Sequence, residues 1–232
     1  MLNEIAHQTS NVHSWATGCT SKSVLLDPIE EGGISYRFID TPGLYERNEG
    51  TITSGQAILD ILDMIRSLQG ALHLLIFVTR IGTLHQSTKD CYDLFANLLF
   101  ENRIPAICVI TGCENEDPMS VWASKNEQLF HENGMRFKIL ISTCFAKDGP
   151  FEIAYKPLRE ESTRNVWHAI RQYSLQQPIT VLNMSDAYQQ VITQSCRALH
   201  FDDVCSVGLT KLLSRATRTE TDKHMDHVSP QY

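Results

Sequence analysis

Residues 34–43 read Ile-Ser-Tyr-Arg-Phe-Ile-Asp-Thr-Pro-Gly, and the fold prediction starts from them. Apolar and polar residues alternate up to Asp40, which is the pattern of a half-buried strand. The three residues that follow must form a loop, because Pro42 has no backbone donor and Gly43 permits unusual dihedral angles. The segment therefore predicts a strand that ends on a carboxylate and continues into a loop.

A second strand is predicted just upstream, at Ser23-Val-Leu-Leu26. Between the two strands lies Asp-Pro-Ile-Glu-Glu-Gly-Gly, residues 27–33, whose composition is typical of a turn. The pair therefore predicts a hairpin with a loop longer than the two-residue kind, which adds an antiparallel edge to the sheet.

Downstream, strand and helix patterns alternate. Apolar runs predict buried strands at 71–78, 104–110 and 137–141, and helical spacing predicts helices at 54–68, 87–101, 119–132 and 163–173. We interpret His73, inside the first run, as a hydrogen-bonded core residue. The alternation predicts an α/β fold with a mostly parallel sheet, helices on both faces and one antiparallel edge strand.

Pro178 marks the predicted end of the compact domain. The chain of 232 residues is thus divided into a domain over 1–177 and a C-terminal extension over 178–232. Within the extension we expect a helix at 185–199 and a disordered tail at 217–232.

Composition excludes several classes of protein. The net charge of −7 argues against nucleic acid as the main partner, because phosphate neutralisation needs a basic surface. The seven cysteines include no CxxC pair, which argues against a cysteine-rich zinc site. Because their number is odd and no secretory leader is recognised, we expect reduced thiols and an intracellular, cytoplasmic setting. The longest apolar run, 71–78, is too short to span a membrane.

Four residues occupy positions where a nucleotide could be bound. Asp40 ends a strand at the carboxyl edge of the sheet, where open α/β sheets bind ligands, and can reach a magnesium-bound water. Gly43 can turn its N–H toward a γ-phosphate, and Thr20 can place its hydroxyl on the metal. Glu114 follows a buried strand and can accept the N1 and 2-amino hydrogens of guanine. Each residue alone also fits an ordinary turn or a solvated loop.

The order of these short segments carries a family resemblance. Gly-Cys-Thr at 18–20, Asp-Thr-Pro-Gly-Leu at 40–44 and Thr-Gly-Cys-Glu at 111–114 resemble the GTPases of the septin, chloroplast-import-receptor and GIMAP-like group. The chain looks closest to the GIMAP-like G domains of the fungal type. Residues 79–83 (Thr-Arg-Ile-Gly-Thr) and 114–119 (Glu-Asn-Glu-Asp-Pro-Met) resemble further segments of that family, and the similarity covers 1–173.

The resemblance implies a Ras-like G domain that binds GTP or GDP with Mg²⁺ and acts as a switch. The resemblance makes Thr20 the switch I threonine and a ligand of the metal. It makes Asp40 and Gly43 the switch II pair, and Asp40 is a second ligand of the metal. Thr111, Gly112 and Glu114 take the places of the guanine motif. The family also implies homo- or heterodimers formed through the G domain.

The sequence departs from the family pattern at three places. Gly112 replaces the lysine of the guanine motif, and Glu114 replaces an aspartate. Leu44 stands where many small GTPases have the glutamine that orients the attacking water, so hydrolysis stays open. No Gly-x4-Gly-Lys-Ser/Thr occurs, and residues 18–23 (Gly-Cys-Thr-Ser-Lys-Ser) lack its second glycine.

Because residues 2–6 resemble the end of the helix that follows a P-loop, we expect the first strand, the P-loop and most of the first helix to be missing. Two alternatives to a GTP-binding switch remain at this point. One is a pseudo-GTPase that serves as an interaction module without nucleotide. The other is an unrelated α/β enzyme in which Asp40 is a metal ligand.

Overall fold

The computed structural model describes residues 23–41, 71–147 and 151–180, together with Ile5, Ile61 and Met64. The chain divides into two compact units. The first comprises residues 1–14, 27–38 and 70–180, and the second comprises 15–26, 39–69 and 181–232. Each unit is described by itself.

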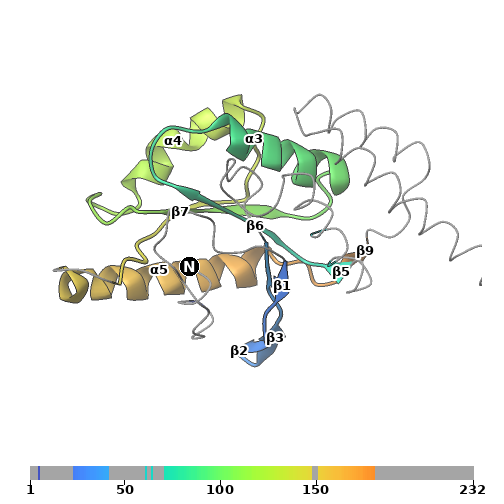
Figure 1. Ribbon diagram of the computed structural model, residues 1–232, viewed down its shortest axis with the longest axis horizontal. Helices are drawn as coiled ribbons and strands as arrows, with labels where there is room; N and C mark the ends of the chain where they lie inside the picture. The colour runs from blue at the N-terminus through green and yellow to red at the C-terminus, as the bar shows by residue number, and fades with distance from the viewer. Residues whose placement is uncertain are drawn as a thin grey trace, which may run out of the picture. The chain divides into compact units, whose positions relative to one another are not determined.

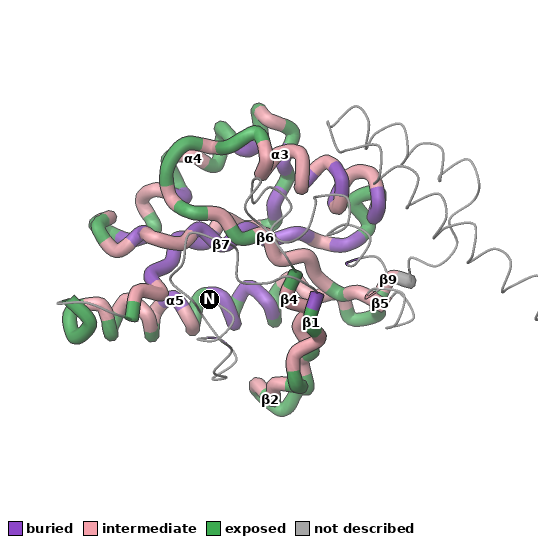
Figure 2. Tube along the Cα trace, in the orientation of Figure 1, coloured by how far each residue is buried: buried purple, intermediate pink, exposed green. Residues whose placement is uncertain are grey.

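The first unit is built on a parallel sheet of three strands in the order β6-β7-β8 (Figure 1). The strands are β6 (Leu75–Arg80), β7 (Ala106–Thr111) and β8 (Leu140–Ser142). The central strand β7 is buried from Ala106 to Ile110, as the burial colouring of Figure 2 shows. The predicted parallel arrangement is thus confirmed for these three strands. The prediction of a buried strand holds for β7, but it is wrong for the run at 71–78, because β6 lies at the edge of the described sheet and none of its residues is buried.

Helices cover both faces of this sheet (Figure 1). On one side lie α3 (Gln86–Tyr92), the π-helix η1 (Asp93–Leu99) and α4 (Val121–Glu132), and on the other side lies α5 (Glu152–Tyr173). The pleat divides the strand residues between the two layers, because successive side chains point to opposite faces. Cys108 and Ile110 pack with Tyr92, Phe130 and Phe137. Helices on both faces are therefore confirmed.

The opposite layer contains the second apolar cluster. Ile107 and Val109 pack there with Val166 and Ile170 of α5. Ile5 is helical, only 1% exposed, and belongs to this cluster. A residue from the first few positions of the chain is therefore part of the core on the α5 side.

The predicted helix at 87–101 has two hydrogen-bonding patterns. Its second half is η1, and the Phe100 N–H still donates to the Phe95 carbonyl, five residues back, at 3.0 Å. Glu101 and Asn102 then adopt positive φ angles of 50° and 56°, which end the helix. The prediction of one continuous α-helix is therefore wrong here, because apolar spacing alone does not distinguish a π-helical turn from an α-helical one.

A hairpin of β2 (Ile29–Glu31) and β3 (Ile34–Tyr36) replaces most of the loop predicted at 27–33. Gly32 and Gly33 form a two-residue turn with φ angles of 60° and 78°. The prediction of a longer loop is wrong, because two glycines at positive φ match the twist of an antiparallel pair. The rings of Tyr36 and Phe38 lie 5.1 and 5.9 Å from the ring of Trp167, which fastens the segment to α5.

The predicted strand at 71–78 is divided into two. β5 (Ala71–Leu72) pairs antiparallel with β9 (Ile179–Thr180), and the chain bends at His73 before β6 begins. His73 is exposed, and its carbonyl accepts a hydrogen bond from the Leu175 N–H at 3.1 Å. The interpretation of His73 as a core residue is therefore wrong, because the side chain lies at a bend between two ladders.

Two element boundaries also differ from prediction. β8 begins at Leu140 rather than at 137, and α5 begins at Glu152 rather than at 163. The longer α5 contains Pro157, a residue that sequence reasoning treats as a helix stop.

In the second unit, β1 (Val24–Leu25) and β4 (Ile39–Asp40) form an antiparallel pair with Val24 opposite Asp40. The predicted strands at 23–26 and before Asp40 are confirmed in these short ladders. Ile61 and Met64, from the helix predicted at 54–68, are helical. The remainder of that helix, the helix predicted at 185–199 and the tail at 217–232 lie outside the described residues.

Candidate functional site

The candidate site lies where β6 and β7 end together. The parallel register runs from Leu75 opposite Ala106 to Arg80 opposite Thr111, so both strands finish at the same level. The Ile81 N–H donates to the Thr111 carbonyl at 2.8 Å, and the Thr111 hydroxyl donates to the Thr79 carbonyl at 3.2 Å. Thr111 is predicted as a nucleotide contact, but in the structure its hydroxyl group donates a hydrogen bond that links the two strand ends.

Gly112 follows in a conformation that favours glycine. Its φ is +85°, in the left-handed region. A Cβ at this position would lie 3.2 Å from Ile81 Cγ2 and 3.6 Å from both Cγ and Nε of Arg80. The side chains of Arg80, the last residue of β6, and of Ile81 therefore come close to the bare backbone of this turn, where any side chain at position 112 would be strained.

The next residue fixes the turn to the end of β8. The Cys113 N–H donates to the Thr143 carbonyl at 3.1 Å, and the Thr143 N–H donates to the Ile110 carbonyl at 2.7 Å. Burial raises the pKa of the Cys113 thiol and of the Cys144 thiol. Both thiols are therefore held neutral, and they pack as small apolar groups.

Glu114 projects from this turn half-buried. Its carboxylate adds a smaller contribution to the raised pKa of Cys113 and of Cys144, after burial, so it lies close to both thiols. Within the described segments the carboxylate has neither a hydrogen-bond donor nor a cationic partner. A half-buried carboxylate in that state retains its capacity to accept two N–H donors from a ligand.

Ser142, the last residue of β8, and the two residues that follow it, Thr143 and Cys144, are buried. The Ser142 hydroxyl accepts from the Ala123 N–H at 3.2 Å, and the Cys144 N–H donates to the Ser162 hydroxyl at 2.8 Å. These groups fasten α4 and α5 to β8.

The structure brings together three of the six predicted site residues. Thr111, Gly112 and Glu114 share one turn at the carboxyl end of β7. Asp40 ends β4 in the second compact unit. Thr20 and Gly43, predicted for the metal and the γ-phosphate, lie outside the described residues.

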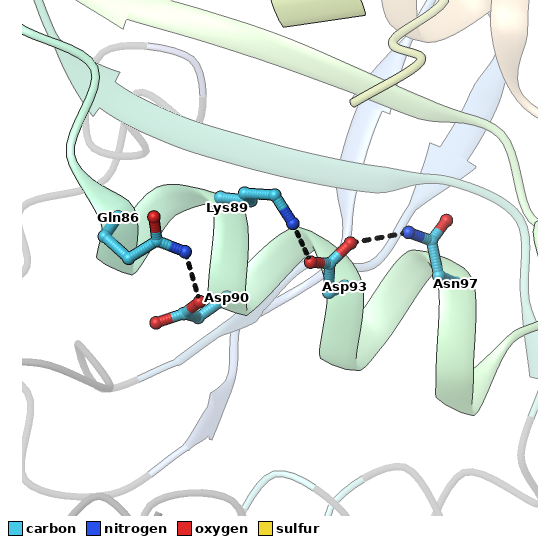
Figure 3. A network of polar contacts seen from close by, with 5 residues as sticks. All are labelled: Gln86, Lys89, Asp90, Asp93 and Asn97. Atoms are coloured by element: carbon cyan, nitrogen blue, oxygen red, sulfur yellow. Dashed lines mark hydrogen bonds and ion pairs between the residues drawn. The ribbon is translucent and has the colours of Figure 1, made fainter. Parts of the chain in front are cut away.

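A second group of polar side chains lies along α3 and η1 (Figure 3). Gln86 Nε2 donates to Asp90 at 2.9 Å, Asn97 Nδ2 donates to Asp93 at 2.7 Å, and Lys89 pairs with Asp93. These contacts between residues four apart stabilise the helix surface itself. Within the segments that the structure describes, no three His, Cys, Asp or Glu side chains are grouped as a metal site would need.

Arg80 is the site residue that sequence reasoning missed. It stands within Thr-Arg-Ile-Gly-Thr, residues 79–83, where the sequence pattern points to no role for it. Counting from the ends of the two predicted strands, Val78 and Ile110, would have placed it opposite Gly112, one residue from its true partner Thr111. The signal existed, but only if both strands were known to be neighbours.

No known family model matches the chain, and no curated protein is significantly similar to it. In the described part of the chain, no helix has the length and apolar character needed to cross a membrane.

Proposed function

We propose that this chain is a guanine-nucleotide-binding protein of the Ras-like, GIMAP-like kind, and that guanine is held by the turn after β7. The observation that carries the proposal is the Glu114 carboxylate. It is half-buried, lies at the carboxyl end of the central strand, and has no partner in the described residues. Open α/β sheets bind ligands at this edge, and guanine presents two adjacent N–H donors to a carboxylate.

The remaining parts of the proposed site come from the sequence. Asp40 and Thr20 would hold Mg²⁺, and the Gly43 N–H would contact the γ-phosphate. Leu44 has no group that can orient water, so the proposed activity is nucleotide binding rather than hydrolysis.

The affinity for GTP is expected to be weak. The 232 residues contain no Gly-x4-Gly-Lys-Ser/Thr segment, so the phosphates lack that loop's N–H donors and lysine. Titration of labelled GTP with Mg²⁺ into the purified chain measures this, and a submicromolar dissociation constant would contradict the expectation.

Base choice tests the proposal itself. The chain is titrated with GDP and with ADP in the presence of Mg²⁺, and GDP is expected to bind more tightly. Glu114→Ala should weaken GDP binding by on the order of 1–3 kcal/mol, because the guanine N–H groups lose their charged acceptor. Glu116→Ala, two residues further on, is the matched control and should bind GDP as the wild type does.

Equal affinity for GDP and ADP would show that Glu114 does not recognise the base. If neither nucleotide binds, the pseudo-GTPase alternative becomes the better description of the chain.

A further inference from the structure

The Arg80 side chain lies beside Gly112, in the same turn that contains Glu114. It is the last residue of β6, is exposed, and stands opposite Thr111 in the parallel ladder. Its Cγ and Nε both lie 3.6 Å from the place where a Cβ on Gly112 would be. The stem and the start of the guanidinium therefore lie beside the backbone of Gly112, where no side chain separates them from it.

The two charged groups flank Gly112 from different strands. Arg80 approaches from the end of β6, whereas the Glu114 carboxylate lies near Cys113 and near Cys144, which follows β8. In the segments described, neither group forms an ion pair, with the other or with any third residue. The Arg80 guanidinium and the Glu114 carboxylate therefore lie on either side of a glycine turn without pairing with each other. Such an arrangement suits a flat ligand whose polar edge can bind the carboxylate and whose face can pack on the guanidinium.

We propose that Arg80 is a base-binding residue, and that its planar guanidinium packs on the face of the purine while Glu114 recognises the edge. The inference rests on the proposed function and adds to it a second contact of a different chemical kind. Guanidinium planes stack on aromatic faces, whereas an ammonium group has no planar surface to offer. Gly112 itself adds no side chain beside Arg80, and the other side chain near that point is that of Ile81.

The two contacts predict different effects on the choice of base. Because stacking uses the ring face, Arg80→Ala should weaken binding of GDP and of inosine diphosphate equally, by about 3- to 30-fold. The preference for GDP over inosine diphosphate should be retained. Glu114→Ala should instead remove most of that preference, because inosine lacks the 2-amino group.

The test uses calorimetric titration of the full chain with GDP, inosine diphosphate, ADP and guanosine. Arg80→Lys should restore only part of the lost affinity, since it retains the charge without the plane. Arg103→Ala, an exposed arginine paired with Glu101 before the start of β7, is the control and should change nothing. Thermal melts of all variants check that folding is intact.

The outcomes separate the inference from the proposed function. If the wild type prefers GDP to ADP and Arg80→Ala binds GDP equally well, the role of Arg80 is overturned alone. If Arg80→Ala weakens GDP but not guanosine, Arg80 contacts phosphate, and the stacking role is likewise overturned. If the wild type binds no purine ligand, the proposed function fails and the role of Arg80 fails with it.

Discussion

At the scale of single residues, two glycines of the first unit provide a matched comparison. Gly112 and Gly134 have nearly equal φ angles, +85° and +79°, but only Gly112 has neighbours within 4 Å of an added Cβ. We expect both alanine variants to lose roughly 1–2 kcal/mol of unfolding free energy to left-handed strain. Gly112→Ala should lose more, because its Cβ meets Ile81 Cγ2 at 3.2 Å.

Urea unfolding of the two variants measures the difference. Equal losses would mean that Ile81 and Arg80 move aside freely, and the close approach over Gly112 would then have no energetic consequence.

Cys108, also at the residue scale, predicts a pH dependence. Burial at the centre of β7 raises the pKa of its thiol from 9.0 to about 12. The folded state favours the neutral thiol, so its burial contributes to the free energy of unfolding. That contribution is fully present below pH 9.0 and is lost as pH rises toward about 12. The free energy of unfolding, measured with urea, should therefore be lower at about pH 10.5 than at about pH 8. The decrease should be smaller in Cys108→Ala than in the wild type.

Other groups titrate in the same range, so the difference between the two proteins is the informative quantity. An identical pH slope in wild type and Cys108→Ala would contradict the expectation.

At the scale of elements, β6 has one bonded edge and one open edge in the described part of its sheet. The N–H groups of Leu75 and Ile81 donate to the carbonyls of Pro105 and Thr111, on the side of β7. The N–H groups of the even-numbered residues between them therefore point away from β7. Val78 lies in the middle of this edge strand and is 52% exposed. A β-branched residue on an open edge favours pairing with another chain.

We therefore expect Val78→Lys to reduce aggregation, because an edge lysine opposes strand pairing. Its effect on stability should stay within about 0.5 kcal/mol, as for most surface substitutions. Val109→Lys, on the buried strand β7, is the contrasting variant and should abolish folding. Light scattering during incubation checks this, and aggregation of Val78→Lys at the wild-type rate would contradict it.

At the scale of the whole molecule, the chain is expected to be marginally stable. The described sheet of the first unit has only three parallel strands, and β6 leaves one row of backbone groups unpaired within it. The residues of β6 are half-buried or exposed, so this row of N–H and C=O groups is open to pairing with another strand. The chain should therefore aggregate, depend on an added strand, or unfold at low temperature.

Size-exclusion chromatography and a thermal melt of the full chain test this expectation. A monomer that unfolds cooperatively above about 55 °C, within the ordinary range of mesophilic domains, would mean that the edge of β6 is not a weakness.

The sequence by itself determined the core of the fold. The apolar run at 104–110 predicts a buried strand, and the structure places β7 at the centre of the described three-stranded sheet. Helical spacing located α4 to within two residues at its start. These predictions succeed because burial of an apolar face is a local pattern with a fixed period.

Tertiary structure decided what local pattern cannot express. The bend at His73 follows from the pairing of β5 with β9, more than a hundred residues away. The helical start of α5 before Pro157 and the π-helical pattern of η1 also contradict local expectation.

The candidate site divides in the same way. The sequence placed Thr111, Gly112 and Glu114 after a buried strand, because they adjoin one another in the chain. Only the parallel register of β6 and β7 placed Arg80 opposite Thr111 and beside Gly112. The physical reason is that strand order and register depend on contacts distant in sequence, whereas a turn is specified by the residues within it.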